Sequence, residues 1–459
     1  MEMAASDDCE VFNEKVSLIF DPHRMDIPPP VIDTTLPPTN GATSIYSLSV
    51  ELLLEIFAYL PLLSQYADSG FAFPWISISE VCRHWYLVAQ ECRELWSIIP
   101  VENLQWTQIA LERSRPVAVS IKIDFQASKA LDIAAVFLAL TELGRIGEIL
   151  IYDPDGENTS VVNDIMQIIA TSPIPRLETL LIDVPDLDLS GSLFNSQAPS
   201  RLRDVQLFQL FTPPASVIFG PHLSTLEIVQ CEVWRSRDDM AITISKLINL
   251  EELVLVGSLP HPQPVASNIW NTHLPRLKRL KVADYIYRLM PMIVFMSFPT
   301  DADVDLAFEV TELWESQLVT LIPLMGHLKT MFAWFFSRKD YHFRFRKFCI
   351  NCHEADYILT VSDPVFLDPA DGKVANDVTP PTVRLSFSYF LEKDPGNRAA
   401  RRIIRRLLRM VQSFVHDSET LELLIHGPTH WSTIWFEAPG FGDTIKRVDL
   451  SKGCGVTVV

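Results

Sequence analysis

The sequence predicts an α/β protein in which a small all-α domain precedes a curved solenoid, with one strand and a helix or irregular arm per repeat. Apolar residues recur at helical spacing between residues 45 and 100. From residue 175 onward, one phrase recurs with apolar residues at relative positions 0, 3 and 5. The length of 459 residues suits a small domain followed by an elongated one. We therefore expect a leader at 1–44, a helical domain at 45–100 and repeats at 101–459.

Composition limits the partners and the compartment. A formal net charge of −19 argues against nucleic acid, which requires a basic surface on the protein. Seven cysteines spread through a long chain indicate free thiols in a reducing compartment, the cytoplasm and/or the nucleus. The N-terminus has no signal-peptide pattern, and the apolar run at 317–336 is broken by Pro323, Gly326 and Lys329. We therefore expect no association with a membrane.

The leader at residues 1–44 is acidic and contains proline clusters. It carries eight acidic and two basic residues, with prolines at 28–30 and 37–38. Such a segment buries too little apolar surface to fold alone, so we expect it to be disordered. The prolines leave a PxxP-type ligand as an alternative.

Two helices are expected in the region 45–100. The first follows Ser49, a good N-cap residue, and runs to Pro61. A loop at 64–75 then leads to the Ser-x-x-Glu spacing of a capping box at 77–80. The helix after this box has one apolar face, made by the following residues: Val81, Trp85, Val88, Ala89 and Cys92.

The first helix has more apolar surface than one core can cover. One stripe is formed by Leu53, Phe57 and Leu60, and a second by Leu52, Ile56 and Tyr59. One stripe can pack on the Trp85 helix. The other must be covered by the repeat domain or by another protein.

The repeated phrases begin at residues 175, 200, 221, 248 and 275. Each has the leucine-rich-repeat pattern, in which neighbouring units stack to bury a shared apolar edge. Their apolar triplets are Leu177, Leu180, Ile182; Leu202, Val205, Leu207; Leu223, Leu226, Ile228; Leu250, Leu253, Leu255; and Leu277, Leu280, Val282. Three further phrases fit through Ile146, Ile149, Ile151; through Leu421, Leu423; and through Ile445, Val448, Leu450. The third phrase also supplies Cys231 at the Asn/Cys position of the pattern and Val233 two residues later.

Helical arms are expected between strands at 130–143, 161–172 and 239–250. Residues 286–415 fit the pattern less well. We expect irregular repeats there, in which the strands around "RLMPMIVFMSF", "VDLAFEV", "KDYHFRFRKFCI" and "VRLSFSYFL" have lost the leucine register.

Two other motifs carry alternative interpretations. Cys349, Cys352 and His353 have the Cys-x-x-Cys-His spacing of haem attachment, and a metal or redox site is conceivable, but no export signal or second ligand pair accompanies them. We interpret the motif as incidental and expect no cofactor, no metal site and no catalytic residue. A basic amphipathic helix at 398–414 fits a repeat arm, which we prefer, or a site for an acidic partner, a membrane surface or a localisation signal.

The region 48–96 resembles the F-box family, of the divergent F-box-like kind. The similarity lies in Leu48 with Glu51, Ile56-Phe57, Leu60-Pro61, Val81-Cys82-Arg83 with Trp85, and Leu95-Trp96. Ser49 stands where the family usually has proline, and the link between the helices is lengthened.

The resemblance implies a non-catalytic subunit that binds a Skp-type adaptor and so joins a cullin–RING ubiquitin ligase. The repeats would then hold a protein substrate, although no substrate-binding residue is assigned. The family's adaptor contacts correspond here to Leu48, Val50, Leu53, Leu54, Ile56, Phe57, Val81, Cys82 and Trp85. Two alternatives stay open: a repeat scaffold whose degenerate F-box binds no adaptor, and a helical cap on the solenoid end.

Overall fold

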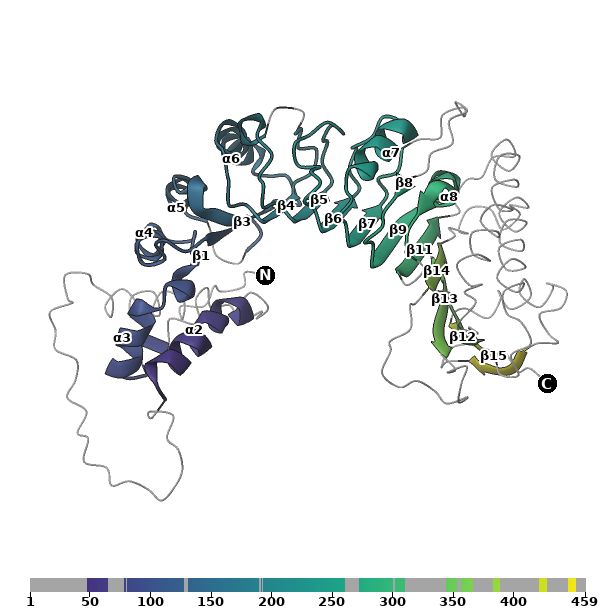
Figure 1. Cartoon of the computed structure of the whole chain (residues 1–459), viewed down its shortest axis with the longest axis horizontal. Coiled ribbons are helices and arrows are strands. Elements are labelled where there is room, and N and C mark those ends of the chain that lie inside the picture. Colours follow the sequence, from purple (N-terminus) through teal and green to yellow (C-terminus); the bar gives the residue numbers. More distant parts are fainter. Residues whose placement is uncertain are drawn as a thin grey trace, which may run out of the picture. The chain divides into compact units, whose positions relative to one another are not determined.

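A computed structural model shows a mixed α/β protein (Figure 1). It divides into two compact units, Met1–Trp96 and Ser97–Val459. The residues that it describes are 48–64, 78–79, 81–127, 131–189, 191, 193–260, 272–299, 302–309, 344–352, 356–365, 383–388, 421–426 and 445–450. The leader at 1–44 therefore lies outside the described residues.

The first unit contains helices α2 (Val50–Ser64) and α3 (Arg83–Glu91) and the 3-10 turn η4 (Arg93–Trp96). At the start of α2, the Leu52 backbone N–H donates to the Ser49 hydroxyl at 3.4 Å, as the sequence predicts. The helix continues one turn past Pro61, where we expected it to end. Proline removes one helical hydrogen bond, but Pro61 is buried, and its packing offsets that loss.

Helix α3 is capped by Cys82 rather than by the predicted Ser-x-x-Glu box. The Trp85 backbone N–H donates to the Cys82 Sγ at 3.5 Å. Residues 78 and 79 form a separate short turn, and Ser77 and Glu80 of the box lie outside the described residues. Val88, Ala89 and Cys92 are buried, which confirms most of the predicted apolar face.

The second unit is built on a sheet of 14 strands. Nine strands follow one another in chain order and pair in parallel: β1 (Ile98–Ile99), β2 (Val119–Asp124), β3 (Ile146–Tyr152), β4 (Thr179–Asp183), β5 (Asp204–Phe208), β6 (Thr225–Val229), β7 (Glu252–Val256), β9 (Arg279–Tyr285) and β11 (Asp303–Glu309). The sheet continues through β14 (Val383–Ser388), β13 (Asp356–Val365), β12 (Arg344–Cys352), β15 (Leu421–His426) and β16 (Ile445–Leu450). A separate pair joins β8 (Thr272–His273) and β10 (Met296–Ser297).

The predicted apolar triplets lie at the same register in successive strands. All eighteen side chains of the six phrases from Ile146 to Val282 are buried. Leu180 pairs laterally with Val205, and the same row continues to Leu226 and Leu253 in β6 and β7. Side chains two residues apart on a strand share a face, so the triplets form continuous apolar rows along one face of the sheet.

The turn after each strand also repeats. Gln209, Gln230 and Gly257 follow β5, β6 and β7, and each has a left-handed φ between 54° and 60°. The Gln209 backbone N–H donates to the carbonyl of Val229, and the Gln230 N–H donates to that of Val256, at 2.8 and 2.7 Å. Each turn is therefore hydrogen-bonded to the end of the next strand.

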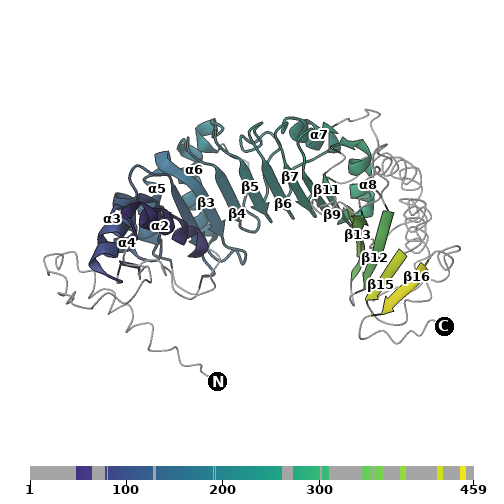
Figure 2. The same ribbon diagram turned by 60° about the horizontal axis from the view of Figure 1, so that its bottom comes forward.

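In the described part of the second unit, five helices connect strands: α4 (Leu104–Arg113), α5 (Ile133–Leu140), α6 (Thr159–Thr171), α7 (Arg237–Ser245) and α8 (Ile286–Phe295). The arms predicted at 130–143, 161–172 and 239–250 correspond to α5, α6 and α7. Within this unit, α5 to α8 lie on one side of the sheet (Figure 2). The other face of β3 to β7, hereafter the open face, carries no helix of this unit among the described residues.

The region after residue 286 differs from the prediction in two ways. "RLMPMIVF" is helix α8, not an irregular strand. Strand β11 has not lost the leucine register, because Val304 pairs with Leu280 and Leu306 with Val282, and both side chains are buried. Strands are present at 344–352 and 383–388, joined through the antiparallel β13.

Strand β15 pairs with β16 at a register different from the one predicted. Leu423 pairs with Val448, and Ile425 pairs with Leu450. The residues of β15 that align with Val448 and Leu450 therefore lie two positions later than Leu421 and Leu423, which the repeated phrase predicts. The predicted strands themselves are present.

Candidate functional site

Helix α2 separates its apolar residues between the interior of the first unit and the surface. The side chains of Leu53 and Phe57 are 0% exposed, whereas those of Leu52, Ile56 and Tyr59 are 49%, 45% and 60% exposed. These three exposed residues are spaced i, i+4 and i+7, so they form one stripe on the helix. We call Leu52, Ile56 and Tyr59 the exposed stripe.

The inward face is held by contacts with α3 and η4. The Phe57 ring meets the Trp85 ring edge-on, with centroids 5.4 Å apart. The Cys92 thiol donates to the Leu54 carbonyl at 3.7 Å, and its burial raises the pKa of this thiol. The Trp96 Nε1 donates to the Ala89 carbonyl at 2.9 Å. The contacts of Phe57 and Leu54 fix the rotation of α2, and so determine which stripe faces outward.

The nine residues that the family resemblance implies for adaptor binding do not lie on one surface. Val50, Ile56 and Val81 are exposed, Leu48, Leu54, Cys82 and Trp85 are half-buried, and Leu53 and Phe57 are buried. The two buried residues support the helix from within. The family pattern did not single out Leu52 and Tyr59, but the helical spacing of the apolar residues did.

Acidic side chains border the exposed stripe. Glu51 and Glu55 are both exposed on α2. A hydrogen bond from the backbone N–H of Glu51 itself, together with one from the Ser49 hydroxyl, lowers the pKa of the Glu51 carboxyl. The stripe is therefore an apolar surface with a negative border, which suits association with a protein rather than chemistry on a substrate.

The open face of the sheet is a second candidate surface. At the alternate positions of β3 to β7, which do not face the apolar rows, five acidic residues occur and no lysine or arginine: Glu148, Asp183, Asp204, Glu227 and Glu252. Aromatic and aliphatic residues lie among them, and Asp183 is paired laterally with Tyr152 and Phe208.

Two carboxylates near the middle of this face differ from those at its borders. Glu252 forms an ion pair with Arg279 at 2.8 Å, whereas no ion pair or hydrogen bond of the Asp183 or Glu227 side chain is found within the described part of the chain. Burial raises the pKa of both groups, and a nearby Lys281 partly counteracts that effect at Glu227. Both carboxylates are half-buried.

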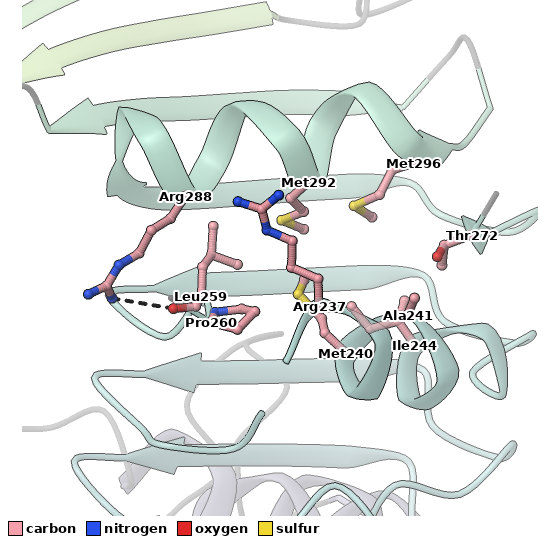
Figure 3. A pocket seen from close by; sticks show the side chains of 10 residues that line it. All are labelled: Arg237, Met240, Ala241, Ile244, Leu259, Pro260, Thr272, Arg288, Met292 and Met296. Carbon is pink, nitrogen blue, oxygen red and sulfur yellow. Dashed lines mark hydrogen bonds between the residues drawn. The ribbon is translucent and has the colours of Figure 1, made fainter. Parts of the chain in front are cut away.

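A small groove lies between α7 and α8 of the second unit (Figure 3). It is lined by methionines, including Met240 and Met292, and by Arg237 and Arg288. Arg288 is held in place, since its Nη1 donates to the Leu259 carbonyl at 3.3 Å and lies 3.9 Å from Asp284. Burial lowers the pKa of Arg237. No catalytic pair of acid and base lines this groove.

The Cys-x-x-Cys-His motif and the basic segment do not form a site among the described residues. Cys349 and Cys352 lie in β12, and His353 is outside the described residues, as is the basic segment 398–414. Among the residues with described side chains, no group of three His, Cys, Asp or Glu could hold a metal ion. Burial raises the pKa of the Cys231 thiol to about 11, so this cysteine is a poor nucleophile near neutral pH.

The helices that the structure describes include none long and apolar enough to cross a membrane. Comparison of the chain with models of protein families, with curated proteins and with solved structures finds no match.

Proposed function

We propose that the chain is the substrate-recognition subunit of a Skp–cullin–F-box ubiquitin ligase. In this proposal α2 and α3 form the F-box, the adaptor binds the exposed stripe, and the repeats hold a protein substrate. The observation that carries the proposal is the stripe itself, in which three large apolar side chains of one helix are about half exposed.

The energetics of the stripe favour a protein partner. Burying a large apolar side chain contributes about 1.5–3 kcal/mol, so each half-exposed member would add on the order of 1 kcal/mol to an interface. A helix with i, i+4 and i+7 anchors is a common mode of insertion into a partner's groove. Leu53 and Phe57, buried below, keep the helix rigid so that little order has to be gained on binding.

The second unit supports the leucine-rich-repeat part of the proposal. Parallel strands in chain order, a shared register of buried triplets and a repeated left-handed turn are the features expected of stacked repeats. At the Asn/Cys position of the pattern, the Cys231 backbone N–H donates to the Ser258 hydroxyl of the next phrase at 3.0 Å. Ser258 occupies the same position in its own repeat and bonds the Ile228 carbonyl at 3.2 Å.

Such a subunit forms no bond itself. The ligase would accelerate ubiquitin transfer because the bound substrate stays close to a charged conjugating enzyme, at a high effective concentration. Specificity would depend on the repeats, whereas entry into the ligase would depend on α2.

The test is reconstitution of the full chain with a purified Skp-type adaptor and cullin–RING complex. We expect a stable complex by size-exclusion chromatography, and we expect Leu52→Asp with Ile56→Asp to abolish it, because charge is then placed in an apolar interface. The control is Ile242→Asp with Ile248→Asp, which changes two exposed isoleucines of the second unit. If the folded wild-type chain forms no complex, the proposal is wrong and a repeat scaffold replaces it.

A further inference from the structure

We infer that the open face of β4 to β6 binds its protein substrate through a basic segment, with lysine or arginine side chains on Asp183 and Glu227. This inference rests on the proposed function, because it names the class of substrate that the repeats would hold. It concerns a surface of the second unit alone and does not involve α2.

The first argument is charge. The open-face positions of β3 to β7 carry five carboxylates and no cationic side chain, in a chain whose formal net charge is −19. On the neighbouring strands, Lys122 lies 3.0 Å from Asp124 in β2 and Arg279 pairs with Glu252, whereas Lys281 of β9 is exposed and lies in the same row as Glu227. The surface therefore favours a cationic partner and disfavours an acidic one.

The second argument is the unmet hydrogen-bonding capacity of the central carboxylates. The Asp183 Oδ1 is buried and has no hydrogen-bond partner among the described residues. A buried carboxylate oxygen without a partner costs free energy, and a guanidinium or ammonium group would remove that cost. The raised pKa values of Asp183 and Glu227 have the same physical origin, since burial desolvates both groups, and Lys281 offsets this only in part at Glu227.

The third argument is the composition between the two carboxylates. Phe208 lies beside Asp183 in register, and Gln206 lies beside Glu227. Tyr152 flanks Asp183 on its other side. Aromatic rings beside a carboxylate suit the stem and head of an arginine, which stacks on a ring while it bonds an acid. A purely electrostatic surface would not need these rings.

The spacing sets the size of the bound segment. Asp183 and Glu227 are two strands apart and lie at positions that differ by two residues along the strand direction. Strand geometry places their Cα atoms roughly 12 Å apart. Two basic side chains four residues apart in an extended peptide point the same way and match this separation, since four residues span roughly 13 Å.

The test is selection of a random peptide library displayed on phage against the purified full chain, followed by affinity measurement of the selected peptides by fluorescence anisotropy. We expect the selected peptides to carry an excess of lysine and arginine. Asp183→Asn with Glu227→Gln should weaken their binding at least about tenfold, because two charge-assisted contacts are lost. Gln206→Lys should also weaken it, since a lysine between the carboxylates competes with the peptide.

The matched control is Glu112→Gln with Asp238→Asn, which removes two exposed carboxylates of the second unit away from the open face. This control should bind the peptides as the wild type does, and circular dichroism should show all variants folded. Peptides without a basic excess, or affinities that Asp183→Asn with Glu227→Gln leaves unchanged, would overturn the inference. Adaptor binding is measured separately, so a failure of the proposed function would not be mistaken for a failure here.

Discussion

The two units of this protein use apolar residues in different ways. In the second unit, the apolar triplets of six successive phrases are buried without exception. In the first unit, one helix buries Leu53 and Phe57 and leaves Leu52, Ile56 and Tyr59 about half exposed. Packing between neighbouring strands therefore accounts for the apolar residues of the repeated phrases. In α2, by contrast, the exposed apolar residues are available to contact a partner protein.

The difference follows from size. Strands β3 to β7 each have a paired strand on both sides, so their apolar residues join into continuous buried rows. In the first unit, the described elements α2, α3 and η4 have a small interior, and one stripe of α2 is left about half exposed. The proposed binding surfaces therefore differ in kind: exposed apolar side chains on α2 in the first unit, and carboxylates on the open face in the second.

The largest expected effect is the loss of a repeat leucine. Leu253→Ala in β7 should lower the free energy of unfolding of the repeats by about 2–5 kcal/mol, because the cavity is surrounded by packed neighbours. Hydrogen exchange of peptides from β6 and β7 measures the change. Ile248→Ala, at an exposed position, should change it by less than about 0.5 kcal/mol. Equal effects of the two substitutions would contradict the repeat packing.

Two adjacent leucines of α2 provide the next test. Leu53→Ala should reduce the local stability of α2 by about 2–4 kcal/mol, whereas Leu52→Ala should change it by less than about 0.5 kcal/mol. Hydrogen exchange of a peptide spanning Val50–Ser64 reports the local opening free energy. A larger effect at Leu52 than at Leu53 would mean that the helix is rotated the other way.

A smaller effect is expected at a shared helix cap. Asp132 Oδ1 accepts from the backbone N–H of Ala134 at 3.0 Å, and its Oδ2 accepts from that of Leu104 at 3.2 Å, so one carboxylate caps α5 and the start of α4. Asp132→Ala should cost about 1–2 kcal/mol in urea unfolding. Asp164→Ala, on the exposed side of α6, is the control and should not be destabilising, because alanine favours helix.

The smallest effect concerns pH. Burial raises the pKa of Asp183 and Glu227, so the folded state holds these protons more tightly than the unfolded state does. These groups therefore destabilise the fold as pH rises above their ordinary pKa. Asp183→Asn with Glu227→Gln should raise the midpoint of thermal unfolding at about pH 7, and the gain should vanish near pH 3, where the wild-type carboxyls are neutral. A lower midpoint at pH 7 would show that each carboxylate has a partner in the folded chain.

Much of the parallel sheet could be predicted because its sequence signal recurs. Leu180, Leu226 and Leu253 occupy the same place in phrases that share a spacing, and the structure puts them in one row. Strand β11 was misjudged because its phrase lacks the first leucine, and only the pairing of Val304 with Leu280 reveals the register. Helix α8 was misjudged because its Met- and Ile-rich sequence, with Pro291, suits a buried strand as well as a helix.

The candidate site was predictable only in part. Helical spacing gave two stripes on α2 that are almost equally apolar, and the sequence does not say which one faces inward. The contact between Phe57 and Trp85 decides it, across a loop and a second helix. On the open face, the pairing of Glu252 with Arg279 depends on residues 27 apart in sequence, so which carboxylates lack a cation appears only in three dimensions.

A test of adaptor binding must change exposed residues of α2. Phe57 is among the residues that the family resemblance implies, but it is buried, and a charge introduced there would unfold the first unit. The most direct measurement is therefore the dissociation constant for a purified Skp-type adaptor, obtained by isothermal titration calorimetry with three chains: the wild type, Leu52→Asp with Ile56→Asp, and Ile242→Asp with Ile248→Asp. We predict that the first pair of substitutions weakens binding at least about a hundredfold, the loss of on the order of 3 kcal/mol, while the second pair binds as the wild type does. Equal affinities of the two variants would contradict the assignment of the exposed stripe as the docking face.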